Sequence, residues 1–242
     1  MKGKWLGAAG IAILCAGQLW AADSTCVKCH ESATAVQYIE HNFADWKKSP
    51  HAKAGISCEA CHGGDAAQAD EAAAHKGMLH STDSKSPLYF TRIPETCGAC
   101  HAAEAQAFGR SRHSQELKRT GRGPNCVTCH GSMANHVLAP RELEMTCTLC
   151  HRRPTQAYAT LMSLNTASQA LQRLGKEIEK ASAAGVDAKA QRESLARAQA
   201  AYRDAVVDWH TFEMDAVLRA SQSAARKANT AISELELKEK QR

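Results

Sequence analysis

The chain has 242 residues, of which 44% are hydrophobic and 23% are charged, and this composition excludes an intrinsically disordered protein. Only 5% of the residues are aromatic, so a core made of side chains alone would be small. The chain also has 11 cysteines, 12 histidines and a net charge of +5. So many cysteines exclude an ordinary cytosolic enzyme, and the question becomes what the cysteines and histidines bind.

The first 22 residues have the pattern of a secretory signal peptide. Two lysines precede an apolar stretch over residues 5–20, and we expect cleavage after Ala21 or Ala22. Cys15 lies in this stretch and would be removed with it. A membrane-spanning helix needs about 20 apolar residues, so an uncleaved membrane anchor is the less favoured alternative. The mature protein is therefore expected in the periplasm.

The other ten cysteines all belong to one pentapeptide, C-x-x-C-H. The five copies contain the cysteine pairs Cys26 and Cys29, Cys58 and Cys61, Cys97 and Cys100, Cys126 and Cys129, and Cys147 and Cys150, followed by the histidines His30, His62, His101, His130 and His151. This pentapeptide is the attachment motif of c-type haem, in which two thiols add to the haem vinyl groups and the histidine ligates the iron. Disulfides would not require a histidine after every second cysteine, and structural zinc needs four ligands. The sequence therefore predicts five covalent haems, in a domain over residues 23–154.

An internal repeat nominates the second axial ligands. Each copy has the order CxxCH, S-x-H, CxxCHG, His, CxxCH, and the third motif is shared by the two copies. The repeat predicts four distal ligands to haem iron: His51, His75, His113 and His136. His80 competes with His75 as an alternate, and His41 is a further alternate that the repeat leaves as a surface residue.

The chain changes character after Pro154. Residues 155–242 contain no proline and no cysteine, and they are rich in alanine and other good helix formers. A helical stripe of apolar residues predicts a first helix, which ends before Gly185, and it consists of Leu161, Leu164, Leu171, Leu174 and Ile178. A second, very long helix is expected from Asp187 to about Leu235, with a bend. The predicted fold class is mainly α, with little regular structure around the haems and a long C-terminal antiparallel helical hairpin.

His210 is the one histidine of the predicted hairpin. Val206, Met214 and Val217 are its i−4, i+4 and i+7 neighbours on the predicted second helix, so its face is apolar. An apolar face suits either a packed core histidine or a helix lying on a haem. Because the repeat supplies four distal ligands for five motifs, we expect His210 to be the fifth distal ligand.

These motifs resemble those of the multihaem c-type cytochromes, and more narrowly the lineage of cytochrome c nitrite reductase, hydroxylamine oxidoreductase and their electron-transfer relatives. The resemblance lies in the five CxxCH motifs, the S-x-H before CxxCHG, the histidine after CHG and the C-terminal helices. It implies closely stacked haems that pass electrons along the chain. Nitrite reductases of this lineage usually have a CxxCK motif at the catalytic haem, which this sequence lacks.

The resulting hypothesis is a periplasmic electron carrier with mostly bis-histidine haems and no catalytic residues. It would transfer electrons between a quinol-oxidising membrane cytochrome and a terminal reductase or an outer-membrane conduit in anaerobic respiration. The alternative is a small reductase of nitrite, hydroxylamine or a related oxyanion, with one open haem. Haem propionates would outweigh the positive charge of the chain, so nucleic acid is not an expected partner. The hairpin is a candidate surface for homo-oligomerisation.

The five motifs predict the covalent haem load of the exported protein. Intact-mass measurement should show five haems on a chain that begins near Ala22 or Asp23. A load of four or fewer, in cells with a full maturation system, would contradict this reading of the motifs. A retained N-terminal segment would favour the membrane anchor.

Overall fold

The computed structural model describes residues 24–31 and 43–241. The predicted signal peptide and His41 lie outside these residues. Within them the chain is built from α-helices and short 3₁₀ helices, which confirms the mainly α class. No helix of the described part is long and apolar enough to cross a membrane.

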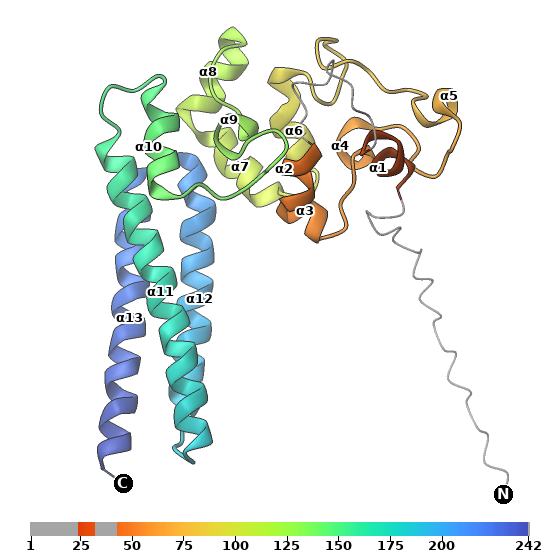
Figure 1. The fold of residues 1–242 in the computed structure, drawn as a ribbon. Helices are drawn as coiled ribbons and strands as arrows, with labels where there is room; N and C mark the ends of the chain where they lie inside the picture. The colour runs from red at the N-terminus through yellow and green to blue at the C-terminus, as the bar shows by residue number, and fades with distance from the viewer. Residues whose placement is uncertain (1–23, 32–42, 242) are drawn as a thin grey trace, which may run out of the picture.

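The N-terminal part contains short helices joined by turns and loops (Figure 1). In chain order these are α1 (Thr25–His30), α2 (Phe43–Lys48), α3 (Pro50–Lys53), α4 (Glu59–His62), α5 (Glu71–Ala74), the 3₁₀ helix η3 (Phe90–Arg92), α6 (Ile93–Gly98), α7 (Ala102–Arg110), α8 (Arg112–Thr120), α9 (Cys126–His130) and α10 (Pro140–Thr148). Most of these helices have one or two turns, too few to be stable in isolation. Their arrangement therefore depends on what they pack against.

The C-terminal part is a bundle of three long helices (Figure 1). Helix α11 (Thr155–Ala183) and helix α12 (Lys189–Asp208) run antiparallel, as the predicted hairpin requires, and Gly185 in the turn between them has a φ of +73°. The structure then differs from the prediction of one long second helix. The chain reverses through the 3₁₀ helix η4 (Trp209–Thr211), and α13 (Met214–Lys240) returns beside α11 and α12.

The reversal between α12 and α13 is made without glycine or proline. Phe212 adopts a left-handed conformation with a φ of +61°, which is unusual for an aromatic residue. The Thr211 hydroxyl donates to the Asp208 carbonyl at 2.7 Å and accepts from the Glu213 N–H at 3.1 Å. These side-chain bonds replace the helical hydrogen bonds that are lost where α12 ends. The periodicity of the sequence contained no sign of this turn.

The bundle core combines leucines with alanines. The predicted apolar stripe of α11 is largely buried, and Leu174 is fully so. Ala198 of α12 and Ala228 of α13 are also fully buried or nearly so, and such small side chains let the helix backbones approach one another. The far end of the core is closed by Leu235, which is 2% exposed. The bundle therefore has an ordinary hydrophobic core of its own.

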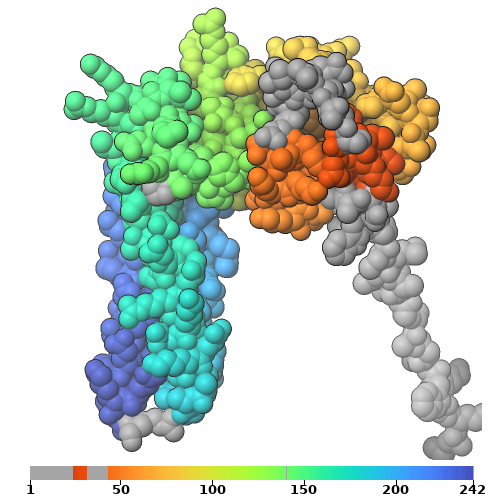
Figure 2. Space-filling model, viewed as in Figure 1, coloured from red at the N-terminus to blue at the C-terminus, as the bar shows by residue number. Residues whose placement is uncertain are grey.

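The bundle joins the N-terminal part at the end where α11 begins and α12 ends (Figures 1 and 2). Helix α7 contacts both α12 and η4, and α10 contacts α11. An ion pair between Arg110 and Asp208, 3.7 Å apart, lies at this junction. Both side chains are exposed, so the pair contributes little stability and the contact depends mainly on packing. The rest of the bundle projects away from the N-terminal part (Figure 2).

We expect Leu174→Ala to destabilise the bundle by about 3 kcal/mol, because it removes a fully buried side chain and leaves a cavity. Leu237→Ala is the matched control, since Leu237 is 57% exposed. It should change stability by no more than about 0.5 kcal/mol. Thermal unfolding of the haem-loaded protein, followed by far-ultraviolet circular dichroism, measures the difference. Equal midpoints for the two variants would contradict the assignment of the core.

Candidate haem-binding sites

Each CxxCH motif folds as a single helical turn. In the second, third and fifth motifs the histidine N–H donates to the carbonyl of the first cysteine at 2.8–2.9 Å. The first and fourth motifs lie inside α1 and α9. Residues i, i+3 and i+4 share one face of a helix, so the two thiols and the imidazole of each motif face the same side. This local geometry suits attachment of one flat group by two sulphur atoms and one nitrogen.

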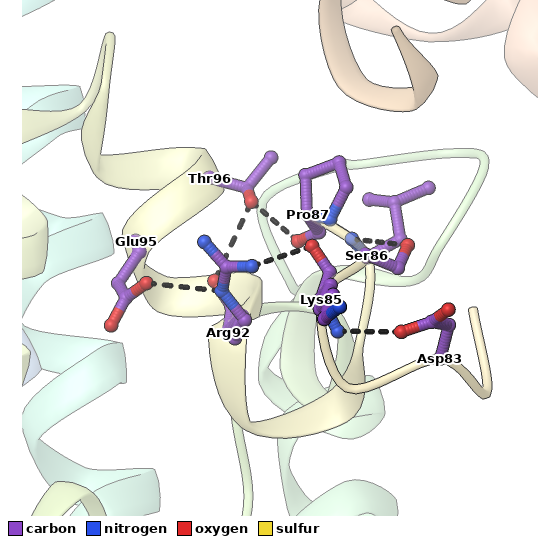
Figure 3. A network of polar contacts seen from close by, with 8 residues as sticks. Asp83, Lys85, Ser86, Pro87, Arg92, Glu95 and Thr96 are labelled. Carbon is purple, nitrogen blue, oxygen red and sulfur yellow. Dashed lines mark hydrogen bonds and ion pairs between the residues drawn. The ribbon is translucent and has the colours of Figure 1, made fainter. Parts of the chain in front are cut away.

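Polar contacts fix the turn that contains the third motif (Figure 3). The Thr96 hydroxyl, next to Cys97, donates to the Pro87 carbonyl. Arg92 donates to the Lys85 carbonyl at 2.6 Å and pairs with Glu95. These bonds hold the preceding loop against the start of α6, so the third motif has a defined position.

The fourth motif begins with a capping box. The Asn125 side chain accepts from the Thr128 N–H at 3.2 Å, and the Thr128 hydroxyl accepts from the Asn125 N–H at 3.1 Å. The Asn125 amide also donates to the Phe90 carbonyl at 2.9 Å. Helix α9 is therefore attached to the segment that leads into the third motif.

The S-x-H element of the repeat is a helix start. Ser49 caps α3 by accepting from the Ala52 N–H at 3.1 Å, and Ser111 caps α8 by accepting from the Ser114 N–H at 3.0 Å. Both serines are buried. His51 and His113 thus occupy the same second position of two short helices. The serine belongs to the repeat because its cap fixes where the helix begins, and therefore where the histidine at the second position lies.

A glycine places His75 close to the second motif. Gly64 follows the CHG of this motif with a φ of +84°, and a Cβ atom there would lie 2.5 Å from the Ala74 carbonyl oxygen. The Asp65 N–H donates to the same carbonyl at 2.9 Å. Only glycine permits this close approach of α5, after which the chain presents His75.

Four proximal histidines each face a second histidine across a similar gap. Ring centres are 6.1 Å apart for His30 and His75, 6.0 Å for His101 and His51, 6.2 Å for His130 and His210, and 5.8 Å for His151 and His113. An imidazole nitrogen binds a metal at about 2 Å and the ring centre lies about 1 Å behind it, so two axial imidazoles on one iron have centres about 6 Å apart. The four pairs have the spacing that bis-histidine ligation of haem requires.

The hydrogen bonds of these rings favour the tautomer that ligates through Nε2. Nδ1 lies 2.8 Å from a backbone carbonyl oxygen in His75 and His130, and 3.2 Å from one in His210. A carbonyl only accepts, so Nδ1 carries the proton and Nε2 keeps its lone pair. A metal-bound histidine is usually oriented by such a bond from its other nitrogen. These contacts are therefore the expected outer support of axial ligands.

The structure does not bring His136 to a proximal histidine ring in the described part of the chain. Its Nε2 lies 3.4 Å from the Glu142 carboxylate, and its backbone carbonyl accepts from His130 Nδ1 at 2.8 Å. The Nδ1 atom of His80 lies 2.8 Å from the Thr82 hydroxyl oxygen and 3.3 Å from the Thr82 backbone nitrogen.

His210 approaches its partner from the turn of the bundle, and not from a continuous helix face. It lies in η4, and burial lowers the pKa of its imidazole. Burial also lowers the pKa of His113, whose ring packs edge-on against Phe212 with the ring centres 4.3 Å apart. A lowered pKa keeps both rings neutral at pH 7, which is the form that binds iron.

Consecutive motifs lie side by side in sequence order. Thr25 in α1 makes two hydrogen bonds to the Ala66 carbonyl, just after the second motif. Helix α9 contacts both α6 and α10. Thiols of neighbouring motifs are also close enough to affect each other. The pKa of Cys58 is raised by burial and then by Cys26 of the first motif. The pKa of Cys61 is raised by burial and then by Cys97 and Cys100 of the third motif.

Thiols of the third, fourth and fifth motifs affect one another's pKa values in the same way. A hydrogen bond with the Cys126 thiol raises the pKa of Cys97. Burial, followed by the nearby Cys147, raises the pKa of Cys129 to about 11. The five attachment turns therefore form one continuous array.

The residues present fit covalent haem. None of the ten cysteines in the described part of the chain forms a disulfide, so their thiols could form thioethers. Apolar side chains flank the thiols, including Met145 and Leu149, which are 70% and 78% exposed and which a porphyrin would cover. The Cys and His donors of each turn would hold one haem, and the facing histidines would complete four of the five iron sites.

Comparisons with known proteins point the same way. The family model for cytochrome c554 and c-prime matches residues 13–63, which contain the first two motifs. The C-type polyheme cytochrome OmcB of Geobacter sulfurreducens is 33% identical over 117 residues, covering 45% of this chain and 14% of that protein. A probable nitrite reductase-hydroxylamine oxidoreductase fusion protein of Kuenenia stuttgartiensis is 24% identical over 184 residues, covering 53% of this chain and 19% of that protein.

The chain thus aligns with less than a fifth of the length of these curated relatives. No solved structure gives a significant match. The repeated attachment motif, the cytochrome family match and the match to a polyheme cytochrome agree on the cofactor and the class. The chain is a multihaem c-type cytochrome.

Proposed function

We propose that this cytochrome carries five covalent haems and transfers electrons in the periplasm. Its donor would be a quinol-oxidising membrane cytochrome, and its acceptor a terminal reductase or an outer-membrane conduit. The observation that carries the proposal is the continuous array of five attachment turns in sequence order. When bound, the haem irons supply one-electron chemistry whose potentials depend on axial ligands, burial and hydrogen bonds. An array of such sites suits conduction over a distance rather than reaction at one point.

The histidine pairs support the carrier reading. At four motifs two imidazoles face each other at the spacing of axial ligands, so both positions on the iron would be filled by protein. His30 of the first motif and His151 of the fifth both belong to such pairs. The motifs at both ends of the array would then lack an open position for substrate. At these four motifs the histidine side chains would orient the irons and exclude exchangeable ligands.

We assign four distal ligands on this basis. His75 serves the first motif, His51 the third, His210 the fourth and His113 the fifth. Replacing any one of the four by alanine should convert one low-spin haem to a high-spin or weak-ligand form. Low-temperature electron paramagnetic resonance of the oxidised protein measures this change. The His130 and His210 planes are 24° apart whereas the other pairs are 54–63° apart, so the fourth site should have a distinguishable g tensor.

His136→Ala is the matched control for this assignment. His136 follows CHG as His75 does, but its Nε2 faces Glu142. The spin state of every haem should be the same in this variant as in the wild-type protein. A high-spin signal in His136→Ala, with an unchanged spectrum in His210→Ala, would overturn the assignment at the fourth motif.

A ligand-binding experiment separates a carrier from a reductase. At the four paired sites the wild-type protein, once reduced, should not bind carbon monoxide, because protein imidazoles occupy both axial positions of the iron. His210→Ala should open one site at the bundle turn and bind carbon monoxide at one more haem per chain than the wild-type protein does. Optical spectra with and without the gas give the stoichiometry.

The alternative function is reduction of nitrite, hydroxylamine or a related oxyanion. It is motivated by the Kuenenia relative, whose name includes both activities. Turnover of either compound by the wild-type protein with an artificial donor, at about 1 s⁻¹ or faster, would refute the carrier proposal. The same assay with His210→Ala shows whether an opened site is sufficient for activity.

A further inference from the structure

The loop that follows the fourth motif contacts the candidate ligands of two different sites. The His136 carbonyl accepts from Nδ1 of His130, the proximal histidine of the fourth motif, at 2.8 Å. The side-chain oxygen of the preceding residue, Asn135, lies 3.2 Å from Nδ1 of His51. His51 faces His101 of the third motif. Two adjacent loop residues thus support imidazoles of the third and fourth sites.

The orientation of the Asn135 amide follows from its second contact. Its Nδ2 donates to the Gly131 carbonyl at 2.8 Å, and a carbonyl cannot donate in return. The amide oxygen must therefore face His51 and can only accept. His51 Nδ1 then carries a proton, and its Nε2 is left with the lone pair that binds iron. One side chain determines both the tautomer and the direction of the ring.

The backbone at Asn135 is specialised for this contact. Its φ is +42°, a conformation that asparagine adopts several times more often than most other residues. The Asn135–Gly131 bond closes the loop on itself, and this closure keeps the amide beside His51. The position therefore needs a residue that tolerates a positive φ and also presents an acceptor.

The repeat explains why this loop lies beside the third site. In the first copy, the histidine after CHG is His75, and it faces the first motif of that copy. The equivalent residue of the second copy is His136, which would face the third motif. That motif is shared by the two copies, and His51 already lies opposite His101. The loop consequently reaches the third site with a hydrogen-bond acceptor and not with a ligand.

We propose that Asn135 is a positioning residue for His51 and lowers the reduction potential of the third haem. The proposal rests on the ligand assignment made above. A hydrogen bond from Nδ1–H to the amide oxygen increases the electron density of the ring, and this favours ferric over ferrous iron. Because the same loop also holds His130, it fixes the third and fourth sites relative to each other.

Two substitutions at this position test the proposal in the haem-loaded protein. Asn135→Gly tolerates the positive φ and removes both side-chain bonds, so the potential of one haem should rise. Asn135→Asp loses the bond to Gly131 but keeps an acceptor, now negatively charged, beside His51, so the potential of that haem should stay at or below the wild-type value. Ser132→Gly is the control, since it adds a glycine at an exposed position of the same loop. Redox titration followed by optical and paramagnetic resonance spectra gives both readouts.

The affected haem is identified with His51→Ala, which should remove the same low-spin signal that Asn135→Gly shifts. An upward shift of that signal's potential in Asn135→Gly, absent in Asn135→Asp and Ser132→Gly, supports the proposal. A new high-spin signal in Asn135→Gly alone also supports it. Wild-type behaviour of both Asn135 variants, or equal shifts in all three loop variants, would overturn it. Failure of the ligand assignment itself would be seen separately, as an unchanged spectrum in His51→Ala.

Discussion

The spacing of paired imidazoles is the constraint on which the rest of this structure depends. Each attachment turn fixes two thiols and one histidine locally, but a second histidine must come from elsewhere and stop about 6 Å away, ring centre to ring centre. The short helices of the N-terminal part serve this requirement. Helices α3 and α8 each begin at a buried serine and place a histidine at their second residue. Little else in this part forms a conventional core, and the helices are arranged around the sites.

The two repeat copies share the third motif, so two histidines, one from each copy, would be expected opposite the same proximal histidine. Only one of them lies there. The S-x-H histidines behave alike, since His51 and His113 each face the last motif of their own copy. The two histidines that follow CHG cannot both face the first motif of their own copy. The first motif of the second copy is the third motif of the chain, which is also the last motif of the first copy. His51 takes the position opposite His101, and the second-copy loop supplies Asn135 and a carbonyl. The fourth motif then faces a histidine from the bundle.

The features that could be predicted from the sequence are those set by local chemistry. The attachment turns, the apolar stripe of α11 and the Gly185 turn follow from spacing and residue type. The repeat also nominated His51, His75 and His113, which the structure places opposite proximal rings. The displacement of His136 depends on competition for a shared site, which a linear alignment of the copies does not show. The reversal after α12 is made by Thr211 and Phe212. A glycine or proline there would have indicated a turn in the sequence, but these two residues do not.

That reversal explains how a bundle with its own core becomes part of the redox sites. A continuous helix would have carried His210 past the fourth motif along a straight axis. The turn instead presents His210 to His130 and, two residues later, packs Phe212 against His113 of the fifth site. Both contacts are made within one turn, in which Phe212 has a left-handed backbone. These contacts with the fourth and fifth sites fix the start of α13 and therefore its direction. Helix α13 in turn packs against α11 and closes the bundle core. If His210 and His113 ligate iron as proposed, ligation of the fourth and fifth sites and folding of the bundle would be coupled through four residues, Trp209 to Phe212.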